Sequence, residues 1–258
     1  MDSKSQTATI TPAAYRWASL AANSELFFYS AAAGVNLLLL FIGFAPFFLH
    51  LQGESGRTLH PGMVMFDVAH GVSITAWYVL SLVQALLVAS NNRRLHMKLG
   101  WLSVALIPLV VISSVLTALR SVGNIPELNF FQIPFPHFLL LMLTQVTVFT
   151  VCSISGVLLR KRPAVHRVLM LTSSISLLLG ATSRIAWLND LFGGYVPAGY
   201  FGPVFVYGAL LVILGSIRLG KFDHRLAAGY ALIVVSNMIA FAVSGTNFWE
   251  HWAKVLTS

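Results

Sequence analysis

Four histidines stand at the ends of long apolar stretches and are the side chains best placed for chemistry. His70 and His96 bracket one stretch, and His137 and His166 bracket a second. Neutral imidazole is the commonest metal ligand in proteins. One histidine from each of two facing helices is also what the axial ligation of a b-type haem requires. What these residues could do therefore depends on the elements that position them.

The composition predicts an all-α membrane protein. Of 258 residues, 57% are hydrophobic and only 9% are charged, whereas soluble domains carry about a quarter charged residues. The mean hydropathy is +0.80. Within a bilayer, helices satisfy their backbone polar groups internally. The single cysteine, Cys152, lies in an apolar run, so a disulfide within the chain is excluded.

Seven apolar spans divide the chain, each close to the ~20 residues that cross ~30 Å of hydrocarbon. The N-terminal segment, residues 1–27, is polar and could form an interfacial helix at 12–26. The transmembrane domain covers residues 28–245, and an aromatic tail, residues 246–258, follows it. The predicted spans are about 28–50, 68–90, 99–119, 136–159, 167–188, 201–218 and 226–245.

The basic residues predict the orientation of the spans. The formal charge of +8 resembles a nucleic-acid signal, but the positive charges cluster in short turns between spans. This clustering is typical of cytoplasmic loops, so we expect a lipid bilayer and no nucleic acid as partner. The N-terminus is then inside and the C-terminus outside. On the inner side this orientation places Lys4, Arg16, Arg93, Arg94, Lys98, Arg160, Lys161, Arg162, Arg167, Arg218, Lys221 and Arg225.

Spans two to seven form three similar helical hairpins. Each hairpin has a basic inner turn with one histidine, which is His96, His166 or His224. The first two hairpins also begin with an outer histidine, His70 or His137, whereas the third has none. The inner histidines could therefore belong to the construction of the turn, capping carbonyl groups or meeting lipid phosphate. The outer pair could likewise be satisfied by loop carbonyls.

One histidine on each of four consecutive spans resembles the arrangement in cytochrome b561-like transmembrane proteins. That resemblance implies b-type haem, electron transfer and a quinone as a candidate partner. Carried over residue by residue, it makes His70 and His137 one axial pair and His96 and His166 the other. About 20 helical residues separate His70 from the inner turn, or roughly 30 Å, so the two sites would lie at opposite membrane surfaces.

Short motifs between about residues 66 and 190 resemble a family of uncharacterised bacterial polytopic membrane proteins. The resemblance implies the bacterial inner membrane and supplies no activity. The residues that carry it are His70-Gly71, Ala76-Trp77, Leu95-His96, Gly100-Trp101, His166-Arg167, Met170 and Arg184.

Arg184 is a positive charge near the outer end of the fifth span. An arginine at a helix centre costs ~2.5–3.5 kcal/mol on insertion scales and less toward the ends, so a partner is expected. Asp67, Asp190 and a haem propionate are the candidates. Alternatively, the side chain extends to the outer surface.

Three functions remain open, and the chain carries no P-loop, HExxH or C-x-x-C motif that would indicate an enzyme. The first is a b-type haem protein that transfers electrons, with His70, His137 and Arg184 at its main site and His96 and His166 at a second. Another is an accessory or scaffold subunit of a larger membrane complex. The third is a carrier or binding protein for a small hydrophobic or anionic ligand.

Overall fold

In the part of the chain that the structure describes, seven long apolar helices form a bundle, which confirms the prediction of an all-α membrane protein. The computed structural model describes residues 12–53, 58–124, 129–130, 133–193 and 197–257. The candidate membrane spans are Leu26–Gly43, Val64–Ala89, Leu102–Asn124, Phe135–Leu158, Pro163–Thr182, Ala198–Leu219 and His224–Ser244. The predicted orientation and the internal repeat stay predictions.

The spans belong to helices α1 (Pro12–Gly43), α3 (Val64–Ala89), α5 (Leu102–Asn124), α6 (Phe135–Leu158), α7 (Pro163–Thr182), α9 (Ala198–Leu219) and α10 (His224–Ser244). Short elements join or follow them, and these are α2 (Ala45–His50), α4 (Arg93–Gly100), β1 (Asn129–Phe130), β2 (Ile133–Pro134), α8 (Ala186–Asp190) and α11 (Asn247–Thr257). Strands β1 and β2 pair with each other in antiparallel orientation.

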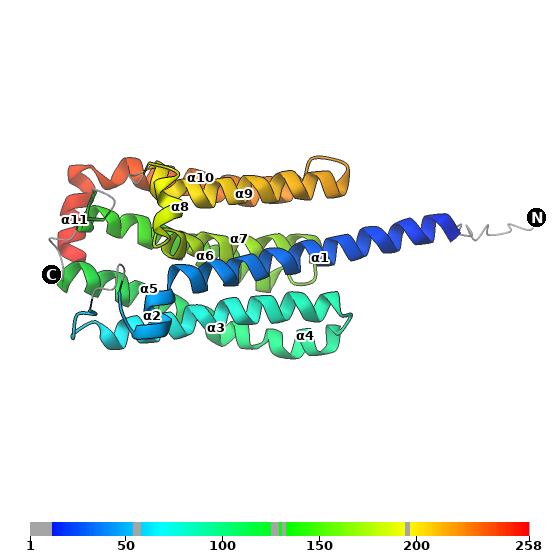
Figure 1. Cartoon of the computed structure of the whole chain (residues 1–258), viewed down its shortest axis with the longest axis horizontal. Helices are drawn as coiled ribbons and strands as arrows, with labels where there is room; N and C mark the ends of the chain where they lie inside the picture. The colour runs from blue at the N-terminus through cyan, green and yellow to red at the C-terminus, as the bar shows by residue number, and fades with distance from the viewer. Residues whose placement is uncertain (1–11, 54–57, 125–128, 131–132, 194–196, 258) are drawn as a thin grey trace, which may run out of the picture.

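The two ends of the bundle differ in the elements that they carry (Figure 1). We call the end with α2, α8 and α11 the loop end, and the end with α4 and the turn at Leu159–Arg162 the basic end. At the basic end the side chain of Asn92 caps α4 by accepting from the backbone N–H of Leu95 at 3.2 Å. Such caps satisfy backbone donors that the first helical turn leaves unpaired.

Several helix boundaries differ from the predicted spans. Helix α1 runs continuously from Pro12, so residues 12–26 do not form a separate helix, and it ends at Gly43 rather than near residue 50. Pro46 lacks a backbone N–H and restricts the residue before it, and the chain restarts there as α2. Helix α7 ends at Thr182, which leaves Arg184 in the turn before α8.

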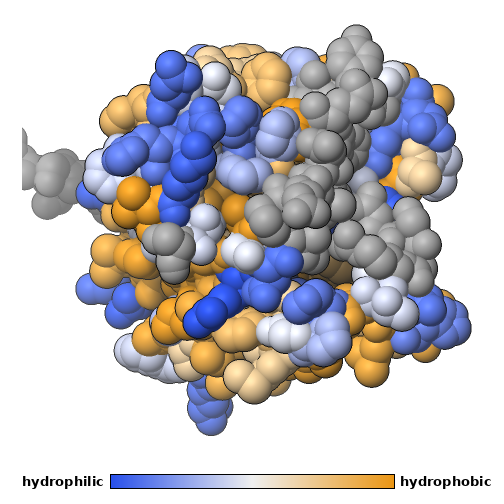
Figure 2. Space-filling view, turned by 90° about the vertical axis from the view of Figure 1, so that its left-hand side faces the viewer, coloured by the Kyte–Doolittle hydropathy of each residue, from blue (hydrophilic) through white to orange (hydrophobic). Residues whose placement is uncertain are grey.

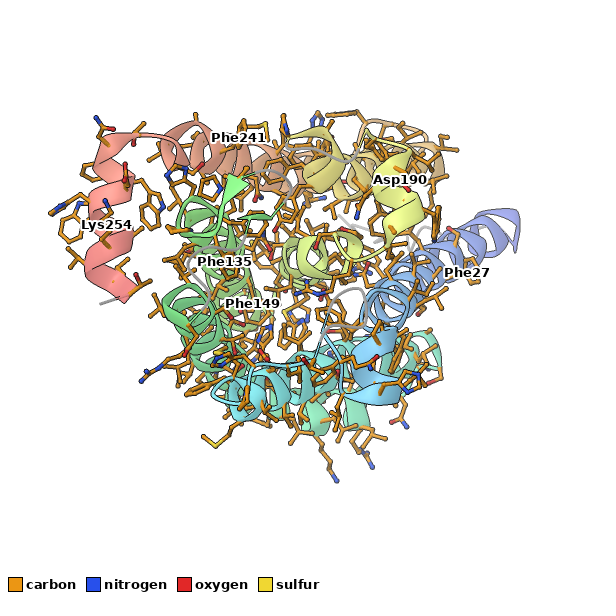
Figure 3. All side chains as sticks on the ribbon, turned by 60° about the vertical axis from the view of Figure 1, so that its left-hand side comes forward. Phe27, Phe135, Phe149, Asp190, Phe241 and Lys254 are labelled. Carbon is orange, nitrogen blue, oxygen red and sulfur yellow. The ribbon has the colours of Figure 1, made fainter. Side chains whose placement is uncertain are left out.

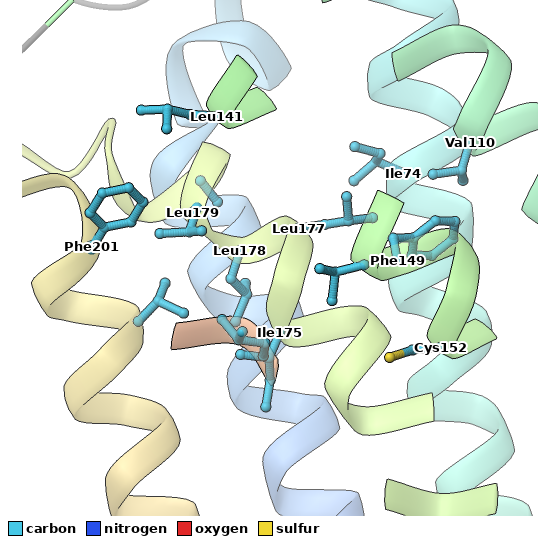
Figure 4. Close-up of a cluster of buried hydrophobic side chains, with 14 of the residues drawn as sticks. Ile74, Val110, Leu141, Phe149, Cys152, Ile175, Leu177, Leu178, Leu179 and Phe201 are labelled. Atoms are coloured by element: carbon cyan, nitrogen blue, oxygen red, sulfur yellow. The ribbon is translucent and has the colours of Figure 1, made fainter. Parts of the chain in front are cut away.

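Helices α6 and α7 form the centre of the bundle. Phe149 of α6 and Leu178 and Leu179 of α7 are completely buried, and Figure 4 shows them between neighbouring helices. Leucine, isoleucine and valine side chains on the outer faces of α5, α9 and α10 are exposed, as expected for surfaces that meet lipid. At the loop end, hydrophilic and hydrophobic residues are interspersed (Figure 2).

Candidate functional site: a cavity at the loop end

A cavity of about 560 Å³ lies in the loop-end half of the bundle. Ligand sites in proteins typically have volumes of about 300–1,000 Å³ and mostly apolar walls. Helices α1, α2, α3, α5, α6, α7 and α9 all contribute to this cavity. Its apolar wall includes Leu40, Phe44, Phe47, Ile74, Phe135 and Phe138. The fold therefore encloses a space of ligand size at the end where the loops lie.

Polar side chains from different elements reach the cavity. They include His70 of α3, Ser114 of α5, Gln145 of α6, Arg184 of the α7–α8 turn and Tyr200 of α9. Arg184 brings a positive charge to this set. Polar groups that converge in an otherwise apolar cavity are what orients a bound molecule.

His70 is held by helix α5. Its Nδ1 lies 3.3 Å from the hydroxyl of Ser114, and that hydroxyl donates to the carbonyl of Val110 at 2.6 Å. One turn away, the hydroxyls of Ser73 and Ser113 lie 2.7 Å apart and join α3 to α5. Serine hydroxyls that bond between transmembrane helices let the helices approach closely. The imidazole therefore has a defined position at the cavity wall.

Gln145 and Tyr200 form a buried pair on the opposite side. The Gln145 amide Nε2 donates to the Tyr200 hydroxyl at 2.5 Å, and both side chains are almost completely buried. The Ser176 hydroxyl of α7 lies 3.4 Å from the backbone carbonyl of Gln145. A buried hydroxyl needs such a partner because desolvating it alone is costly. The pair thus places a phenol group at the cavity.

Arg184 lies just beyond the end of α7 with its guanidinium 4.6 Å from the centre of the Phe44 ring. It also donates to the carbonyl of Gly180. The turn itself is held by Asn189, whose amide donates to the carbonyl of Ser183 at 2.6 Å. Of the predicted acidic partners, Asp67 lines the same cavity, whereas Asp190 is exposed at the end of α8.

His137 does not line the cavity that His70 lines. His137 lies in the first turn of α6 and is not among the described residues that line the cavity. Helix α11 lies beside that turn (Figure 3), and the indole of Trp249 donates to the carbonyl of Pro136 at 3.0 Å. On the same helix, the Lys254 ammonium donates to Glu250 Oε1 at 2.9 Å and lowers the pKa of that carboxyl.

His96 and His166, by contrast, do meet at the basic end. Their ring centroids are 6.3 Å apart and their planes lie at 84°. Nδ1 of His96 is 3.3 Å from the carbonyl of Gln84, and Nδ1 of His166 is 2.8 Å from that of Gly156. Each ring therefore bonds a carbonyl near the end of the preceding long helix, which agrees with the capping alternative. Neither histidine lines the loop-end cavity.

Sequence reasoning missed Ser114 and Tyr200 as cavity residues. No sequence feature distinguished Ser114, because serine is common in transmembrane helices. Tyr200 lies in an aromatic segment typical of a membrane interface, although it turns inward at the start of α9. Gln145, a polar side chain inside an apolar span, was the available signal.

The comparisons with known proteins add no relative. No protein-family model, curated protein or solved structure matches the chain. Among the described residues, no group of three or more histidine, cysteine, aspartate or glutamate side chains could hold a metal ion. The loop-end cavity and the contact between His96 and His166 are therefore the features of the molecule that bear on its function.

Proposed function

We propose that this protein binds a small amphipathic molecule in its loop-end cavity. The observation that carries the proposal is the convergence of polar side chains from five elements in one cavity of about 560 Å³. The aromatic wall would hold the apolar part of the ligand. His70, Arg184 and Tyr200 would meet its polar head. In a multi-pass membrane protein, such a site is accessible to molecules dissolved in the bilayer or in the aqueous phase beside it.

The position of the cavity supports a ligand on the outer side of a bacterial inner membrane. The basic turns lie at the opposite end of the bundle from α2 and α8 (Figure 1), and positive turns favour the cytoplasm. With that orientation the cavity lies in the outer half of the membrane. A carrier that collects its ligand outside, or a protein that holds a lipid-soluble cofactor, would use such a site.

Filling the cavity tests the proposal. Ala118 of α5 is buried and lines the cavity, so Ala118→Leu should occupy ligand space. Ligand at 100 times its Kd stabilises the native state by about 2.7 kcal/mol. We expect wild-type protein to gain thermal stability with at least one member of a panel of quinones, fatty acids and total lipid extract. The Ala118→Leu variant should show no gain.

The arginines of the loop end provide a matched control. Arg184 lines the cavity and stacks on Phe44, whereas Arg120 is exposed, stacks on Phe66 and is not a cavity residue. Arg184→Gln should reduce the ligand-induced stabilisation, and Arg120→Gln should leave it unchanged. Equal stabilisation of the wild type and Ala118→Leu, or a flat response of the wild type to the whole panel, would contradict the proposal.

A b-type haem protein is the second candidate, and the pair at the basic end supports it. The ring centroids of His96 and His166 lie 6.3 Å apart, so these two side chains would hold the haem iron between them. The carbonyl bonds at Nδ1 would leave both Nε2 atoms for the iron. His96 and His166 would therefore be the residues that hold the haem, since His137 does not line the cavity that His70 lines. A haem would supply one-electron transfer, and a quinone is the candidate partner for that transfer.

An absorption spectrum tests this second candidate. Protein purified from haem-replete cells should show a Soret band and a pyridine haemochrome, and His166→Ala should lose both. His224→Ala is the control, because His224 is an exposed histidine of another basic turn. Colourless wild-type protein would exclude the haem function and leave the proposal for the cavity unaffected.

A further inference from the structure

We propose that Ser114 fixes the tautomer of His70, so that the cavity selects a ligand that carries a hydroxyl group beside an acceptor oxygen, as a hydroquinone does. The inference rests on the proposed function, because it names the class of molecule that the loop-end cavity binds. Ser114 acts here as a positioning residue, through His70. The steps follow from the hydrogen bonds around the two side chains.

The first step is the direction of the bond between Ser114 and His70. A serine hydroxyl has one proton, and the 2.6 Å contact with the Val110 carbonyl uses it. The Ser114 oxygen lies 3.3 Å from Nδ1 of His70. Because its proton is already used, this oxygen can only accept a hydrogen bond from Nδ1. Nδ1 must therefore carry the hydrogen. In neutral imidazole, that assignment leaves Nε2 without a proton.

The second step is that the helix contacts hold this arrangement in place. Ser73 and Ser113 are hydrogen-bonded at 2.7 Å, and Ser73 also donates to the carbonyl of His70 at 2.9 Å. These bonds clamp α3 and α5 beside the imidazole. The edge of His70 that carries Nδ1 therefore faces α5, and Nε2 is the ring nitrogen left for the cavity.

The third step is the contrast with the other polar groups of the cavity. Arg184 can only donate hydrogen bonds. Tyr200 accepts a hydrogen bond from Gln145, so its own proton makes it a donor as well. Beside the carboxylate of Asp67, the cavity thus combines strong donors with a nitrogen acceptor, Nε2 of His70. A ligand that complements both needs an acceptor oxygen and a hydroxyl proton.

A hydroquinone meets this requirement, since one hydroxyl can donate to Nε2 while the second oxygen accepts from Arg184 or Tyr200. The corresponding quinone and the dimethyl ether offer acceptors only, and either would leave Nε2 without a hydrogen-bond donor. Leaving a buried polar group unsatisfied lowers affinity by about 5- to 150-fold. The cavity should therefore prefer the hydroquinone over both analogues by about tenfold or more.

The test compares three probes on the full-length protein under anaerobic conditions with reductant for the hydroquinone. We would measure Kd for a short-chain p-benzohydroquinone, its quinone and its dimethyl ether. The wild type should prefer the hydroquinone by about tenfold or more. Ser114→Ala should bind with little preference, and Ser114→Thr should restore it. The matched control is Ser103→Ala, which removes a buried hydroxyl of the same helix outside the cavity and should keep the preference.

Nitrogen-15 NMR of the histidine rings gives a second reading that needs no ligand. The wild type should show His70 protonated at Nδ1, as should Ser103→Ala, whereas Ser114→Ala should show a mixture of tautomers. Equal affinity of the wild type for the three probes, or an unchanged preference in Ser114→Ala, would overturn the inference. If no probe binds, the inference falls, while a stabilising lipid extract that Ala118→Leu abolishes would keep the proposed function.

Discussion

At the scale of the residue, some side chains of the cavity determine whether their neighbours donate or accept hydrogen bonds. Gln145 donates to Tyr200 and so leaves the phenol as a donor, and Ser114 leaves Nε2 of His70 as an acceptor. Each of these pairs crosses from one helix to another. Buried polar groups of this kind are favourable only when their partners are present.

A pair of glutamine substitutions tests the bond to Tyr200. Gln145→Leu removes the donor to a buried hydroxyl, so we expect a loss of about 1–3 kcal/mol of stability. Gln84→Leu is the control, because neither amide atom of Gln84 has a hydrogen-bond partner, and this change should be neutral or stabilising. Thermal unfolding in detergent measures both. Similar losses in the two variants would show that the Gln145–Tyr200 bond contributes nothing specific.

The residues show what a linear pattern can predict. The shared depth of His70, Asp67 and Arg184 follows from their distances to the span ends, and all three line one cavity. His137 was predicted at that depth too, but depth along a helix does not fix the direction around its axis. Trp249 of α11 packs on the first turn of α6 at Pro136, and a contact between segments so distant in sequence has no local signal.

At the scale of the element, the cavity depends on the break between α1 and α2. Because α1 ends at Gly43, the chain turns and α2 places Phe47 against α3, where a Cβ on Gly71 would come within 2.7 Å of the ring. Phe44, in the break itself, carries the guanidinium of Arg184 on its ring. A straight first span through residue 50, as expected from hydropathy, would not form this wall. The sequence feature that indicates this break is Pro46, because a proline restricts the backbone conformation of the residue before it.

Gly43 should be sensitive to any side chain. A Cβ at this position would collide with the backbone of Ala181 in α7, which can yield only if α1 and α7 separate. We expect Gly43→Ala to destabilise the protein by about 1–3 kcal/mol and to weaken ligand binding, since Gly43 also lines the cavity. Gly245→Ala, with no atom within 4 Å of its Cβ, should have little effect on the melting temperature. Unchanged melting of Gly43→Ala would contradict the close approach of α1 and α7.

At the scale of the whole molecule, the distribution of apolar and basic residues was sufficient to predict seven spans. Span number follows from hydropathy, since a bilayer requires a minimum apolar length. Among the described residues, seven helices meet that requirement. The shape of the cavity was not predictable in this way, because it depends on which helices pack together. The orientation remains a prediction that rests on the basic turns.

Cysteine labelling tests the orientation directly. In a Cys152→Ser background, Lys161→Cys places a thiol in the exposed turn of the basic end, and Phe248→Cys places one on exposed α11. A membrane-impermeant maleimide should label intact cells at residue 248 only, and residue 161 only after permeabilisation. The reverse pattern would mean that the basic turns face outward and the cavity faces the cytoplasm.

The most direct measurement for the loop-end cavity is native mass spectrometry of protein extracted gently from its own membrane. We predict one small amphipathic molecule for each wild-type chain and an empty chain for Ala118→Leu, whose added side chain occupies the cavity. A wild-type chain without bound molecule, or the same bound mass in both proteins, would contradict the central claim that this cavity is a ligand site.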